Sequence, residues 1–87
     1  MEINEKVFQE HLDNKAITQI KIILNEEGKY NLLLSLNWKK GEEKLLTARG
    51  EWRSWVSLDR LIRHLKSKTK QLPPISLIIP DRNKKEG

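Results

Sequence analysis

The sequence predicts a small α+β protein: a single two-layer domain in which a three-stranded antiparallel meander precedes an amphipathic helix and a fourth short strand. Three observations favour this β-β-β-α-β order: alternating apolar residues at 30–38, a capped apolar stripe at 58–65, and two prolines before a last apolar run. With 87 residues, the chain has room for one hydrophobic core.

An alternating run from Tyr30 to Trp38 is the clearest strand in the sequence. Its even positions are aromatic or leucine, whereas Asn31, Ser35 and Asn37 occupy odd positions. Period two is typical of a strand with one buried face, so the run predicts that Trp38 belongs to the core.

Two further strands are expected to flank this run. Residues 17–24 are the predicted partner, joined through a loop at 25–28 in which Gly28 suits a positive φ. A second turn at 39–42 then leads into a predicted third strand at 44–53.

The helix carries its own start and stop signals. The Ser57 hydroxyl is expected to cap the first turn, and Asp59 lies near the positive end of the helix dipole. Pro73 and Pro74 cannot continue a helix, so residues 75–79 are predicted to form the last strand. The apolar stripe consists of Leu58, Leu61, Ile62 and Leu65.

The two ends of the chain carry weaker patterns. The first dozen residues, with Val7, Phe8 and Leu12, are compatible with a short N-terminal helix. Residues 81–87 are polar and predict a mobile tail, so we expect the domain to span residues 1–80. The sequence has no cysteine, no signal-peptide pattern and no apolar run near the roughly 20 residues that cross a membrane, which favours a cytoplasmic protein without membrane contact.

Positive charge is concentrated between residues 49 and 70. This stretch holds seven Lys/Arg and two Asp/Glu, so it carries a net charge of +5, equal to that of the whole chain. Such a basic stretch favours contact with DNA or with an acidic protein surface, although the same residues are also typical of a solvated helix face. The candidate nucleic-acid-binding residues are Arg53, Arg60, Arg63, Lys66 and Lys70.

The position of Arg53 and of two tryptophans bears on this hypothesis. A strand position directs Arg53 away from the helix face, unless it turns at the strand end towards the start of the helix. Trp52 and Trp55 lie where strand meets helix, so we expect core packing rather than base stacking.

Three large aliphatic residues are predicted on the sheet face opposite the helix: Ile23, Leu33 and Leu45. An apolar patch among polar residues is typical of a contact site. We expect either the N-terminal segment or a second copy of the chain to cover it. The alternative function is therefore a non-enzymatic protein-interaction or dimerisation module.

No catalytic residue, metal site, cofactor or small-molecule substrate is predicted. His64 follows Asp59 by five residues rather than four, which is poor spacing for a metal pair, so we expect it to face solvent or a phosphate. His11 has no ligand spacing, and Ser57 is interpreted as a helix cap rather than a nucleophile. The glycines form no phosphate-binding or dinucleotide motif.

Resemblance to known proteins is carried by the second half of the chain. The run Arg53-Ser54-Trp55-Val56-Ser57-Leu58-Asp59-Arg60-Leu61-Ile62, followed by Leu65 and Leu72-Pro73-Pro74-Ile75, resembles small uncharacterised proteins encoded on plasmids and integrative conjugative elements (plasmid-related proteins). The resemblance implies a mobile-element setting, where accessory proteins bind DNA or another element-encoded protein. It implies no site residues. The predicted function is a small basic accessory protein of a mobile genetic element.

Overall fold

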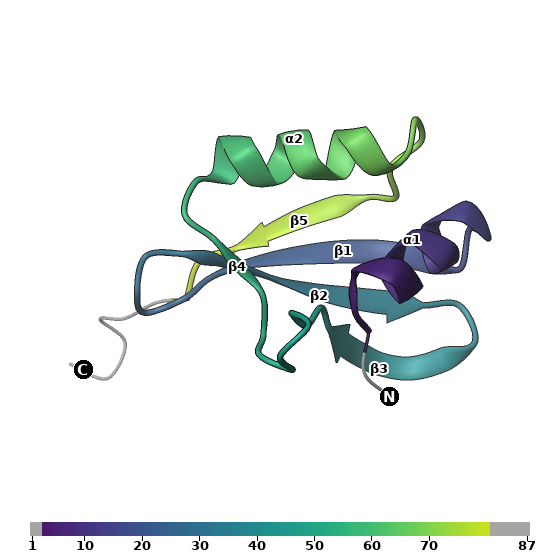
Figure 1. The fold of residues 1–87 in the computed structure, drawn as a ribbon, viewed down its shortest axis with the longest axis horizontal. Helices are drawn as coiled ribbons and strands as arrows, with labels where there is room; N and C mark the ends of the chain where they lie inside the picture. The colour runs from purple at the N-terminus through teal and green to yellow at the C-terminus, as the bar shows by residue number, and fades with distance from the viewer. Residues whose placement is uncertain (1–2, 81–87) are drawn as a thin grey trace.

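The computed structural model describes residues 3–80 and confirms a small α+β protein, whose sheet is mixed (Figure 1). The short N-terminal helix is present, and the predicted tail at 81–87 lies outside the described residues. Neither helix in the described part of the chain has the length and apolar character needed to cross a membrane. The elements are α1 (Glu5–Asp13), β1 (Ile17–Leu24), β2 (Tyr30–Leu36), β3 (Lys39–Lys44), β4 (Ser54–Trp55), α2 (Leu58–Lys68) and β5 (Ile75–Ile78).

The strands lie in the order β3-β2-β1-β5, and the two-residue strand β4 pairs with the start of β2. The hairpins β1–β2 and β2–β3 are antiparallel, whereas β5 runs parallel to β1. The parallel pairing follows from the connection through α2, because a helical crossover returns the chain to the end of the sheet from which it started. The last strand therefore lies beside the first.

The buried face of the sheet is formed by alternate residues of β1 and β2. Ile20 lies opposite Leu34, and Ile22 lies opposite Leu32, all of them fully or almost fully buried. Both helices pack on this face, α1 through Phe8 and Leu12 and α2 through Leu61 and Leu65. The N-terminal helix therefore does not cover the opposite face of the sheet. The expectation that the N-terminal segment covers Ile23 and Leu33 is wrong.

The second turn comes earlier than predicted. The chain reverses at Asn37 and Trp38, and β3 begins at Lys39, which pairs with Leu36. The predicted turn at 39–42 is therefore part of a strand. Trp38 is 52% exposed and lies against the ring of His11, so its prediction as a core residue is wrong. The alternating sequence pattern continues to Trp38, two residues beyond the end of β2, because the position of the turn is set by the pairing of β2 with β3.

Leu45 is fully buried rather than part of an exposed patch. Lys44 pairs with Leu33 and shares its face, so the next residue points to the helix-covered face beside Leu32. There Leu45 bridges to Ile3. The prediction of Leu45 as an interface residue is wrong because a register shift of one residue exchanges the two faces of a strand.

Residues 45–53 do not form the continuous strand that the sequence predicted. Thr47 and Gly50 close a turn, with the Gly50 amide donating to the Thr47 carbonyl at 2.9 Å. Beyond it, the Trp52 ring nitrogen donates to the Leu32 carbonyl at 2.8 Å, and Trp55 is buried in the core as predicted. The Ser57 side chain caps α2 by accepting from the Arg60 amide at 3.3 Å. The local signals for the helix start are thus confirmed.

Replacing Leu45 with alanine is expected to lower the free energy of unfolding by about 2–5 kcal/mol, because it leaves a cavity in the core. The matched variant Leu33→Ala removes the same atoms from a half-buried position on the opposite face, so its cost should be clearly smaller. Urea denaturation monitored by tryptophan fluorescence measures both. Equal losses would contradict this placement of the two leucines.

Candidate nucleic-acid interface

The outward face of α2 presents exposed positive charge. Arg60, Arg63 and Lys66 recur every three residues and are exposed, while the opposite side of the helix inserts into the core. Residues spaced in this way lie along one face of a helix. Lys70 is also exposed and follows α2 by two residues. We call these four residues, Arg60, Arg63, Lys66 and Lys70, the α2 basic face.

One acidic residue lies among these cations. Asp59 Oδ2 is 3.3 Å from Arg63 Nη2, one helical turn away, and both side chains are largely exposed. Exposed pairs of this kind contribute little to stability, about 0–1 kcal/mol, and are screened by salt. A phosphate can therefore compete for Arg63 with little loss.

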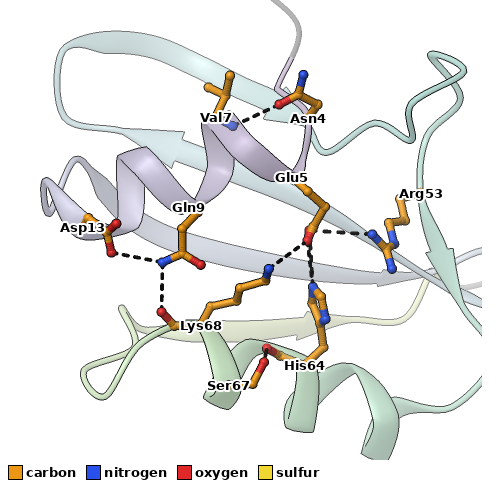
Figure 2. A network of polar contacts seen from close by, with 9 residues as sticks. All are labelled: Asn4, Glu5, Val7, Gln9, Asp13, Arg53, His64, Ser67 and Lys68. Atoms are coloured by element: carbon orange, nitrogen blue, oxygen red, sulfur yellow. Dashed lines mark hydrogen bonds and ion pairs between the residues drawn. The ribbon is translucent and has the colours of Figure 1, made fainter.

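Three other donors surround the carboxylate of Glu5 at the start of α1 (Figure 2). His64 Nε2 lies 3.0 Å from Glu5 Oε1, Lys68 Nζ lies 3.4 Å from the same oxygen, and Arg53 Nη1 lies 3.7 Å from Oε2. We call Glu5, Arg53, His64 and Lys68 the Glu5 cluster. It joins α1, α2 and the residue before β4.

The cluster is supported by further contacts. The side-chain amide of Gln9 donates to the Lys68 carbonyl at 2.9 Å and to Asp13 at 3.0 Å, which adds a second link between the helices (Figure 2). The rings of His64 and Trp55 have centroids 5.4 Å apart. These contacts fix the orientation of α2, and hence the direction in which its basic face points.

Two residues differ from what the sequence suggested. His64 was expected to face solvent or a phosphate, but its ring is enclosed by Glu5 and Trp55, so that prediction is wrong. The alternative for Arg53 was a turn towards the start of α2; its guanidinium instead pairs with Glu5 at the start of α1 and lies 4.8 Å from the centre of the Trp55 ring. Arg53 therefore differs from the α2 basic face because its ion pair is partly buried, whereas the pair of Arg63 with Asp59 is largely exposed.

Glu5 and Gln9 were absent from the predicted site. Glu5 precedes His64 by 59 residues, Gln9 precedes Lys68 by the same distance, and no motif connects them. The acidic first turn of α1 is the only local signal, and it indicates a helix start rather than a partner. Within residues 3–80, no group of three or more His, Asp or Glu side chains is suited to hold a metal ion.

The sheet face away from the helices, which we call the open face, carries the other two predicted interface residues. Ile23 and Leu33 are both half-buried there. Leu33 pairs with Lys21 on one side and Lys44 on the other. Lys21 forms an ion pair with Glu42, and Lys44 lies over the Trp52 ring, so long side chains flank Leu33. An interface at Ile23 and Leu33 stays a prediction.

Comparison of the chain with protein-family models, with curated proteins and with solved structures gives no match.

Replacing Glu5 with glutamine is expected to lower the free energy of unfolding by about 1 kcal/mol, because the neutral amide attracts the three surrounding donors less strongly. Glu10→Gln is the matched control, since Glu10 is exposed on the same helix. Urea denaturation at low and high salt measures both. If the Glu5 cluster links the helices, the difference between the variants shrinks at high salt. No difference at either salt concentration would contradict this role.

Proposed function

We propose that this chain is a small basic accessory protein that binds nucleic acid through the α2 basic face. The observation that carries the proposal is the division of the cations into two groups. Arg53 and Lys68 have Glu5 as an ionic partner, whereas the α2 basic face is exposed and has Asp59 as the acidic residue within ion-pair distance of Arg63. Its charge is therefore available to a ligand.

The chemistry of this face favours the phosphate backbone as the ligand. The planar guanidinium groups of Arg60 and Arg63 can each donate two parallel hydrogen bonds to a phosphate. The buried side of α2 and the Glu5 cluster hold the helix in place, so binding requires little ordering of the backbone. Phosphate contacts carry no base sequence by themselves, so the proposed binding is largely independent of sequence.

The resemblance to plasmid-encoded proteins supports a mobile-element setting for this activity. In that setting, a protein that binds DNA without sequence preference would assist other proteins encoded on the same element. An acidic protein surface presents carboxylates to the same arginines, so it is the competing ligand for this face.

Titration into labelled duplex DNA between about 50 and 200 mM salt tests the proposal. If each of the four cations neutralises one phosphate, the slope of log K against log salt is about −3.6 for one α2 basic face. Fluorescence anisotropy at several salt concentrations gives this slope. A slope near zero, or no binding at low salt, would overturn the proposal and favour the acidic protein surface.

Reversing Arg60 and Lys66 to glutamate should reduce the slope to about −1.8 or abolish binding, because two contacts become repulsive. The double reversal Lys6→Glu with Lys40→Glu is the matched control. It changes net charge equally at exposed positions outside the face. Circular dichroism should show both variants folded. If both weaken binding to the same extent, net charge rather than this face is responsible.

A further inference from the structure

The two long edges of the sheet differ in composition. In the described residues, β3 and β5 are the ends of the strand order, so each has one side without a neighbouring strand along its length. Exposed edges invite pairing with other chains, and charged side chains discourage it. β3 has such protection in Lys39, Lys40, Glu42, Glu43 and Lys44. A hydrogen bond with Lys39 also lowers the pKa of the Glu43 carboxyl, which favours its charged form.

β5 lacks this protection. Residues 71–80 carry no charged side chain, although a third of the whole chain is charged. Leu77, Ile78 and Ile79 are 45%, 39% and 63% exposed. The segment therefore has the composition of an interior strand but lies at an edge.

The backbone of β5 is oriented to accept another strand. The Ile20 amide donates to the Pro74 carbonyl at 2.9 Å, while Ile20 pairs in register with Ile75. Hydrogen-bonding groups alternate in direction along a strand, so Pro74, Ser76 and Ile78 face β1. The amides and carbonyls of Ile75 and Leu77 consequently point outward. Proline occupies none of these outward positions within β5.

We propose that β5 pairs antiparallel with β5 of a second copy of this chain, about a two-fold axis at Leu77. In this register Leu77 faces Leu77, and Ile75 faces Ile79, so outward amides meet outward carbonyls. The same register places apolar side chains opposite one another on the helix-covered side. It joins the two sheets into one through an isologous contact.

The lack of charge in this segment favours a second copy as the occupant. Each copy carries a net charge of +5, so two copies repel, and this repulsion is weakest where they meet through uncharged segments. The β5 segment is such a region and is complementary to itself. An acidic partner would instead be attracted to the α2 basic face.

The pairing has a consequence that rests on the proposed function. A two-fold axis perpendicular to the sheet leaves both helix layers on the same side of the joined sheet. The two α2 basic faces then lie on one side of the dimer. Binding of one duplex by both faces would make the salt slope about −7.2, for eight phosphate contacts.

Molecular mass in solution tests the pairing. Sedimentation equilibrium is expected to give a dimer for the natural chain and a monomer for Leu77→Pro, because proline removes the amide that faces the partner and is tolerated at an edge. Leu77→Lys should also give a folded monomer, since it places two cations at the axis. In the control Ile78→Pro, the lost amide faces β1, so the melting temperature should fall. A monomeric natural chain, or a dimeric Leu77→Pro, would overturn the proposal.

DNA binding by Leu77→Pro separates this inference from the proposed function. A folded monomer with a halved salt slope supports both. A monomeric natural chain that still binds DNA with a slope near −3.6 overturns the β5 pairing and leaves the α2 basic face standing. A natural dimer that does not bind DNA supports the pairing and overturns the proposed function.

Discussion

The burial of one face of β1 and β2 determines where every other surface of the molecule lies. Ile20, Ile22, Leu32 and Leu34 leave water together, and the apolar sides of both helices must cover them. Once both helices lie on this face, they lie close enough for Glu5 to reach α2. The open face and the outward side of α2 are then left to solvent.

The packing of the helices also divides the positive charge of the second half. Arg53 and Lys68 lie near the junction of the helices and share the Glu5 carboxylate, whereas Arg60 and Lys66 point away from it. The same layer arrangement leaves β5 at the edge, with its uncharged sequence partly exposed. Charge and apolar surface are thus presented at separate places, the first on a helix and the second along a strand.

Local patterns predicted much of the fold. The run at 17–24 forms β1, Gly28 adopts a positive φ of 79° in the following loop, and Ser57 caps α2. Each of these features depends on residues a few positions apart, which is why periodicity and capping were sufficient. Three of the five predicted nucleic-acid-binding residues, Arg60, Arg63 and Lys66, also share a face for the simple reason that helical spacing is local.

The sequence by itself determined the α+β class, the start of the main helix and the concentration of positive charge. Tertiary structure alone decided the position of the turn at Trp38, the burial of Leu45, the parallel pairing of β5 and the contact between Glu5 and His64. A strand exposes either face equally well until its register is fixed by a neighbouring strand. Contacts between residues 59 positions apart form only when the core brings two helices together.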